Sequence, residues 1–175
     1  MVSPLVAILM GSDSDLPVMR GAVEVLNQFG VPHEVHVMSA HRSPDRVSAY
    51  VVAAPDRGVR LFVCGAGMAA HLAGMVAAHT ALPVIGVPLA SSSGLGGADA
   101  LFATVQMPPG IPVATVAVNG ARNAAHLAVR ILSLSDPDLA ARVAAFRQSL
   151  DTEVAAKDAR LGELGVDGYL SQDRS

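Results

Sequence analysis

Hydrophobic residues gather in five short runs that are apolar almost throughout instead of alternating with polar residues. Such runs, rich in Val and Ile, are typical of strands buried on both faces of a parallel sheet. Stretches with the apolar spacing of helices separate them. The predicted strands are Val6–Met10, Val35–Met38, Leu61–Cys64, Pro83–Val87 and Val113–Val118, and the predicted helices are Leu16–Phe29, Pro44–Asp56, Ala69–His79 and Ala121–Leu132.

The alternation of strands and helices predicts an α/β fold. We expect a three-layer, doubly wound parallel sheet of the flavodoxin-like type with right-handed crossovers. A further helical segment, Asp136–Arg160, has Ser135 or Asp136 as its N-cap. We expect one α/β domain over residues 1–160, including this appended C-terminal helix over 136–160, and a flexible tail over 161–175. The helix could cover a sheet edge or pack on another subunit, and the pattern leaves both open.

Composition narrows the possible partners. The 175 residues are 51% hydrophobic but only 3% aromatic, which predicts one core of small aliphatic side chains. A net charge of −3 gives no attraction for nucleic acid or an anionic membrane, so neither is expected as a partner. The one cysteine, Cys64, lies in an apolar run, and no apolar segment is long enough to span a membrane. We therefore expect a cytoplasmic protein.

Ligands of parallel sheets bind at the carboxyl ends of the strands, and three of the loops there carry unusual residues. After the first predicted strand, Ser12, Ser14 and Asp15 bring hydroxyls and a carboxylate to the start of a helix. Free helix amides attract anions, so the loop could bind phosphate or ribose. Ser and Asp are also the preferred N-cap residues, so a purely structural role explains the loop equally well.

The loop after the second predicted strand contains Ser39, Ala40, His41 and Arg42. Arg suits paired hydrogen bonds to phosphate, and His is the side chain that exchanges protons near neutrality. A His and Arg pair on a surface loop is common, but the position at a strand end favours function.

The loop after the third predicted strand, over 65–75, has only small residues until Met68, so a ligand could approach its backbone amides. It lacks the third glycine and the acidic partner of a dinucleotide fingerprint, which we reject. His71 could equally be a structural residue bonded to a neighbouring loop or a catalytic one.

Other chemistries find less support. The six histidines lack the spacing of a metal site, and no Gly-x-Ser-x-Gly sequence marks a serine nucleophile. We therefore predict no metal.

Taken together, Met-Gly-Ser-x-Ser-Asp at 10–15, Ser-Ala-His-Arg-x-Pro at 39–44 and Gly-Ala-Gly-x-Ala-Ala-His-Leu at 65–72 resemble the PurE family. The resemblance covers roughly residues 6–132. The second and third motifs are similar to those of its first subclass, the mutases. The second subclass, which uses free carbon dioxide, is the alternative.

The resemblance implies a cofactor-free isomerase of purine biosynthesis that moves a carboxylate from the exocyclic nitrogen of aminoimidazole ribonucleotide to a ring carbon. It implies a homo-octamer whose final helix reaches a neighbouring subunit. It implies that His41 is the general acid and base, and that Ser12 and Asp15 contact the carboxylate region and the ribose. The resemblance also implies that phosphate is bound by Ser14, Ser39 and Arg42, with Ala40 beside them. The pocket wall that holds the migrating carboxylate would consist of Gly65, Ala66, Gly67, His71 and Leu72.

The chain departs from the family pattern at Met68, where relatives usually carry a third glycine, and at Ala73, where they usually carry proline. The alternative outside enzymes is a nucleotide-binding α/β module, because this fold hosts many functions. A phosphoacceptor receiver would need Asp where Gly65 stands. A flavin module would need an aromatic-rich loop, which is missing at the predicted strand ends.

Overall fold

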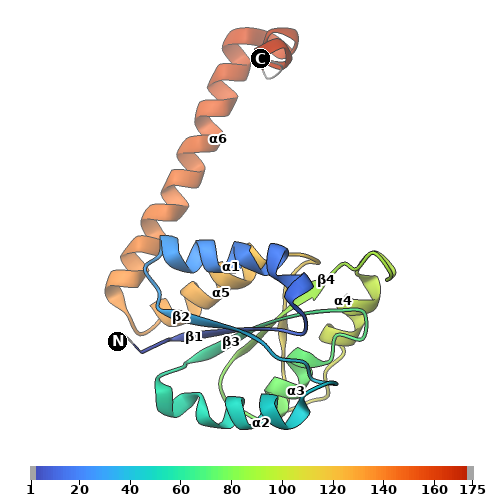
Figure 1. Ribbon diagram of the computed structural model, residues 1–175. Helices are drawn as coiled ribbons and strands as arrows, with labels where there is room; N and C mark the ends of the chain where they lie inside the picture. The colour runs from blue at the N-terminus through green and yellow to red at the C-terminus, as the bar shows by residue number, and fades with distance from the viewer. Residues whose placement is uncertain (1–2, 173–175) are drawn as a thin grey trace. The chain divides into compact units, whose positions relative to one another are not determined.

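Five parallel strands form one sheet in the computed structural model, which describes residues 3–172 (Figure 1). The strands are β1 (Val6–Met10), β2 (His33–Val37), β3 (Leu61–Gly67), β4 (Val84–Leu89) and β5 (Ala114–Thr115). Their order is β2-β1-β3-β4-β5, with Val6 of β1 opposite His33 of β2 and Leu61 of β3. This is the flavodoxin-like order, so the predicted sheet is confirmed.

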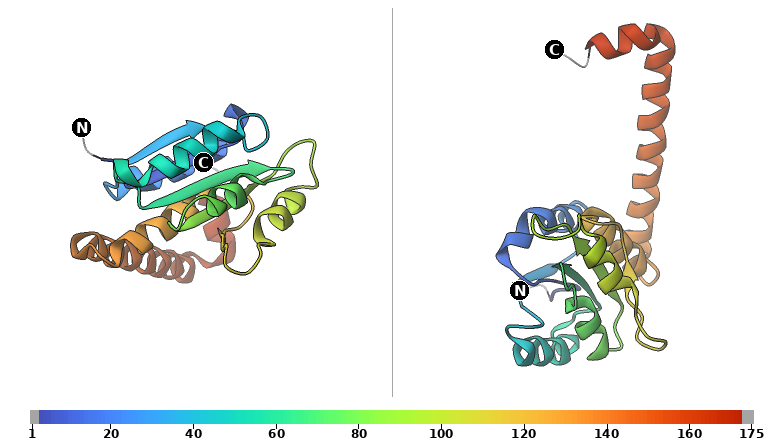
Figure 2. Two further views of the ribbon diagram at one scale, coloured as in Figure 1. Left: turned by 90° about the horizontal axis from the view of Figure 1, so that it is seen from below. Right: turned by 90° about the vertical axis from the view of Figure 1, so that its right-hand side faces the viewer.

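Helices cover both faces of this sheet (Figures 1 and 2). One layer contains α1 (Leu16–Gln28) and α5 (Ala121–Ser133), and the other contains α2 (Pro44–Ala53), α3 (Leu72–Ala78) and α4 (Ala98–Val105). Two short 3-10 helices, η1 (Asp13–Asp15) and η2 (Pro55–Arg57), precede α1 and follow α2. The predicted three layers are therefore present.

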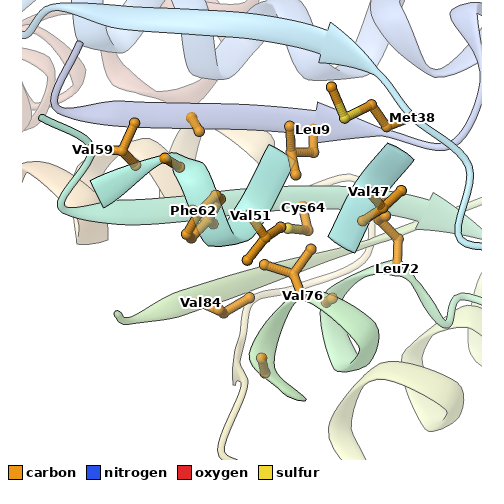
Figure 3. Close-up of a cluster of buried hydrophobic side chains, with 14 residues drawn as sticks. Leu9, Met38, Val47, Val51, Val59, Phe62, Cys64, Leu72, Val76 and Val84 are labelled. Atoms are coloured by element: carbon orange, nitrogen blue, oxygen red, sulfur yellow. The ribbon is translucent and has the colours of Figure 1, made fainter. Parts of the chain in front are cut away.

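The core between the sheet and the α2–α3 layer consists of aliphatic side chains with one large aromatic ring (Figure 3). Phe62 is fully buried there among Val51, Val76 and other small side chains. Burying a ring of this size contributes about 1.5–3 kcal/mol. Cys64 lies in the same cluster at 1% exposure, and burial raises the pKa of its thiol. It behaves as a small hydrophobe, as predicted.

Several bounds differ from the predicted ones: β2 begins at His33, β3 extends to Gly67 and α2 ends at Ala53. Three further differences have a local reason. β5 is two residues long because the facing Pro88 in β4 has no N–H to extend the ladder. α3 begins at Leu72 instead of Ala69 because Met68 has a left-handed backbone, with a φ of 53°. α4 was not predicted: Phe102 and Val105 are apolar yet exposed, which hides its amphipathic pattern.

The C-terminal helix α6 (Pro137–Gln172) belongs to a second unit. By its contacts the chain divides into one unit up to Leu132 and another from Ser133, whereas the prediction placed both in one domain. The backbone N–H of Leu139 donates to Asp136 Oδ1 at 2.9 Å, so Asp136 is the N-cap.

α6 does not give way to a tail at 161. It continues to Gln172, interrupted by non-helical backbone at Gly165, because one glycine such as Gly162 costs only about 1 kcal/mol in a helix. The last three residues of the predicted tail, 173–175, lie outside the described residues. Along residues 3–172, no helix is both long and apolar enough to cross a membrane.

Candidate active site

The loops that follow β1, β2 and β3 meet at the carboxyl edge of the sheet and enclose a cavity of about 350 Å³. That volume is in the range of small-molecule sites. Of the predicted site residues all but Gly65 line it. The lining residues are Gly11, Ser12, Ser14, Asp15, Ser39, Ala40, His41, Arg42, Ala66, Gly67, Met68, Ala69, His71, Leu72 and Ser91.

The loop after β1 is held by a capping box. Ser12 Oγ accepts a hydrogen bond from the backbone N–H of Ser14 at 3.3 Å, and the backbone N–H of Ser12 donates to Asp15 Oδ2 at 3.0 Å. The structural reading of this loop, an N-cap, is therefore confirmed. Because these side chains also line the cavity, capping and binding are compatible.

Asp15 is the one acidic side chain that lines this cavity among the described residues. Burial raises the pKa of its carboxyl, and the neighbouring charge of Asp13 adds to the effect. Hydrogen bonds from backbone N–H groups and the charge of Arg42 oppose the shift without cancelling it. The Asp15 carboxylate is thus held at a cost in free energy where a ligand could contact it.

The loop after β2 presents Arg42 in a fixed orientation. Its Nη2 donates to the carbonyl oxygen of Gly11 at 2.6 Å, which ties this loop to the one after β1. The backbone N–H and Nε of Arg42 both donate to Ser39 Oγ, at 3.2 and 3.4 Å. The guanidinium has five N–H donors, so these bonds leave donors for an anionic ligand.

His41 and His71 form a hydrogen-bonded pair that joins the loops after β2 and β3. Nε2 of His41 lies 2.8 Å from Nδ1 of His71, and the rings meet edge to face with centroids 4.9 Å apart. In such a pair one nitrogen carries the proton that the other accepts. One hydrogen bond therefore links the two rings at the cavity wall. The sequence left open that His71 bonds to a neighbouring loop, and it does; spacing did not identify His41, 30 residues away, as the partner.

The end of β3 supplies the small residues of the wall. A Cβ on Gly67 would lie 3.2 Å from the carbonyl oxygen of Leu89, so the chain approaches β4 closely here. Gly65 is buried behind the cavity, and a Cβ there would lie 2.4 Å from Met19 Sδ. Packing against Met19 explains why position 65 is a glycine. The predicted contact of Gly65 with a ligand stays a prediction.

Ser91, after β4, is a cavity residue that sequence reasoning missed. The signal was present: three consecutive serines, Ser91–Ser93, follow a predicted strand, which is where the rule for parallel sheets places ligands.

Comparison with known proteins agrees with this geometry. The N5-carboxyaminoimidazole ribonucleotide mutase of Synechocystis sp. is 55% identical over 170 residues, which cover 97% of this chain and 96% of that protein. The enzyme of the same name from Thermotoga maritima is 51% identical over 169 residues, or 97% of this chain and 98% of that protein. The crystal structure of Treponema denticola PurE matches with a TM-score of 0.81 and 34% identity, covering 90% of this chain and 98% of that one. A family model described as AIR carboxylase matches residues 5–153. The resemblance seen in the three loop motifs is thereby confirmed, and the chain belongs to the AIR carboxylase, or PurE, family.

Proposed function

We propose that this protein is a 5-(carboxyamino)imidazole ribonucleotide mutase of purine biosynthesis. Full-length relatives named as such mutases share 50–55% identity with it. The observation that carries the proposal is the His41–His71 pair at the wall of a cavity that also holds Arg42 and Asp15. Anion binding and proton exchange are what moving a carboxylate on a nucleotide requires.

In this reaction His41 gives one proton to the substrate and later takes one back. The bond between the exocyclic nitrogen and the carboxylate carbon breaks, carbon dioxide is released into the cavity, and His41 gives the nitrogen a proton. The ring carbon then attacks the retained carbon dioxide, and His41 removes the proton from that carbon. The enzyme returns to its starting state, so the reaction needs no external acid, base or cofactor.

The histidine pair suits this cycle because one group must act first as acid and then as base. Nδ1 of His71, 2.8 Å from His41 Nε2, fixes the direction of the His41 ring and can share its proton. A single shared proton is sufficient, because the isomerisation has no net proton change.

The cavity residues divide into three groups by chemistry. Arg42, Ser39 and Ser14 supply donors for the phosphate, and Ser12 and Asp15 face the ribose and the carboxylate region. The walls of the carbon dioxide site are Ala40, Ala66, Gly67, His71 and Leu72, with Gly65 beneath them.

His41→Asn tests the proposal. Acid–base residues contribute about 100- to 10,000-fold, so turnover of the carbamate nucleotide should fall at least that far while calorimetry shows near-normal binding of the carboxylated product. His79→Asn is the matched control, because His79 is exposed directly after α3 and does not line the cavity. Its Nδ1 contacts Met75 O at 2.8 Å. If His41→Asn keeps more than about a tenth of turnover, the assignment fails and His71 is the next residue to replace.

One assay separates the mutase from the carboxylase that uses free carbon dioxide. The purified protein is given the carbamate nucleotide or, separately, aminoimidazole ribonucleotide with bicarbonate, and formation of the carboxylated product is followed. Faster turnover of the carbamate supports the mutase. Preference for the second mixture would establish the other subclass, and no turnover of either would favour a binding module.

We also propose that the protein is a cytoplasmic homo-octamer in which α6 packs on a neighbouring subunit. Leu150, Val154 and Leu161 are 40–65% exposed at a spacing that places them along one side of the helix, which favours a second apolar surface. Sedimentation should show a large assembly, and truncation after Ser135 should give smaller species. A full-length monomer at micromolar concentration would contradict this.

A further inference from the structure

Ser91 brings a fourth strand-end loop to the candidate active site. It lies two residues after the end of β4 and lines the same cavity as His41 and Arg42. A Cβ on Gly67 would lie 3.8 Å from Ser91 Cβ, so this serine stands directly against the small-residue wall at the end of β3. Its side chain can therefore reach a ligand that occupies the cavity.

The hydroxyl of Ser91 is oriented by its own loop. Ser91 Oγ accepts a hydrogen bond from the backbone N–H of Ser93 at 3.3 Å, and the carbonyl oxygen of Ser91 accepts one from Gly94 at 3.1 Å. Among residues 3–172, no acceptor takes the Ser91 O–H. The hydroxyl thus offers a donor, with its oxygen already fixed, at the wall of the cavity.

Asn119 holds the start of this loop from a distant part of the chain. Its side-chain Oδ1 accepts a hydrogen bond from the backbone N–H of Ala90 at 3.0 Å, and its own N–H donates to Pro88 O at 2.8 Å. Asn119 has a φ of 58°, a left-handed conformation that Asn tolerates better than most residues. The backbone of Asn119 is therefore bonded to the end of β4, and its side chain is bonded to Ala90, the residue before Ser91.

Strand order decides which end of a nucleotide Ser91 faces. Arg42 and Ser39 follow β2, and β4 lies three strand spacings away in the order β2-β1-β3-β4. At about 4.8 Å per spacing, the two loops start about 14 Å apart. With the phosphate near Arg42, Ser91 lies at the heterocycle end, beside the wall that would hold the carboxylate.

We propose that Ser91 is a substrate-binding residue whose hydroxyl donates a hydrogen bond to the carboxylate of the nucleotide, and that Asn119 is the residue that positions it. The inference rests on the proposed function, because that function supplies a carboxylated heterocycle with a phosphate at its other end. It adds a fourth loop to the three that the sequence motifs identify.

Ser91→Ala tests the contact, and calorimetry with two probes reads it. Affinity for the carboxylated product should fall at least about tenfold, the size of one hydrogen bond to a charged group. Affinity for ribose 5-phosphate, which lacks the heterocycle, should stay unchanged. Ser92→Ala is the matched control: it is an exposed serine of the same loop outside the cavity, and both affinities should stay at the wild-type value.

Asn119 variants test the positioning role. Asn119→Gly keeps the left-handed backbone but removes the acceptor for Ala90 N–H, and it should reproduce the Ser91→Ala pattern. Asn119→Asp keeps an acceptor oxygen and should restore product affinity to within about threefold. The double variant of Ser91→Ala with Asn119→Gly should bind no more weakly than the weaker single variant, because both act on one contact.

The outcomes separate the two proposals. If the wild-type protein neither turns over the carbamate nucleotide nor binds the product, the proposed function fails. If the wild type is active and Ser91→Ala binds the product normally, or loses ribose 5-phosphate equally, only the present inference is overturned. If the two Asn119 variants behave alike, the positioning role is overturned.

Discussion

Gly65→Ala examines whether packing, not ligand approach, requires a glycine at the end of β3. A Cβ at this position would lie 2.4 Å from Sδ of Met19 and 3.0 Å from its Cγ and Cε. Ordinary contacts begin near 3.4 Å. Met19 is fully buried in α1, so its side chain has little room to move away. The φ of Gly65 lies outside the left-handed region, so alanine meets no backbone strain there.

Overpacking of this kind costs about 1–3 kcal/mol. For a chain of this length, about 2 kcal/mol lowers the melting temperature by about 4–8 °C. Gly11→Ala is the matched control, because it adds the same methyl group just after the neighbouring strand β1, where the nearest atom is Asp15 Oδ2 at an ordinary 3.8 Å. The melting temperature of that variant should change by less than about 1 °C.

Thermal unfolding at fixed protein concentration measures the melting temperatures of Gly65→Ala and Gly11→Ala. Repeating Gly65→Ala in a protein that already carries Met19→Ala makes the test specific for this contact. Met19→Ala removes all three atoms that the new methyl group would approach, so adding Gly65→Ala to it should cost at least about 1 kcal/mol less than in the wild type. Two results would refute this reasoning: the same melting temperature for Gly65→Ala and Gly11→Ala, or the same loss of stability from Gly65→Ala with and without Met19→Ala. Packing against Met19 would then not be the reason for glycine at position 65.

Three further predictions concern cavity residues. Asp15→Asn should raise the melting temperature while lowering activity, because burial raises the pKa of Asp15 and its ionised form therefore destabilises the fold as pH rises above 3.8. In thermal melts the gain in melting temperature should be larger at about pH 7 than at about pH 4. An equal gain at both pH values would contradict the upward shift of the Asp15 pKa. Arg42→Lys should raise the Michaelis constant of the phosphorylated substrate, because an ammonium cannot both reach Gly11 O and form paired bonds to phosphate; steady-state kinetics with an unchanged constant would refute this. Met68→Gly should stabilise the protein by about 1 kcal/mol relative to Met68→Ala in denaturant unfolding, since only glycine relieves the positive φ; equal stability would argue against strain there.

The sheet and most of the candidate site could be predicted because buried parallel strands have a strong local pattern. All five residues of β1 are buried, and the run Val6–Met10 predicted its bounds without error. Once the strands were placed, topology alone required their following loops to share one edge. This is why Ser12, His41 and Gly67 could be expected in one cavity without any knowledge of contacts.

What could not be predicted depends on contacts between distant residues. The hydrogen bond between His41 and His71 requires the exact heights of two loops above the sheet, which no local pattern encodes. The requirement for glycine at 65 comes from Met19, in a helix 46 residues earlier in the chain. The structure reveals such pairs because tertiary packing, not spacing along the chain, brings them together.

Met68 shows how a departure from a family pattern can keep the shape of a site. The family resemblance places glycine here, and the φ of 53° is the conformation that glycine adopts at little cost. A methionine that keeps this backbone must be held there by its surroundings, because alone it would favour another conformation. Its neighbours supply that restraint: the carbonyl oxygen of Met68 accepts the N–H of Ala70 at 2.9 Å, and the next residue, His71, is bonded to His41. The turn that presents His71 therefore persists without the glycine, with the backbone strain at a residue whose side chain is exposed at the cavity.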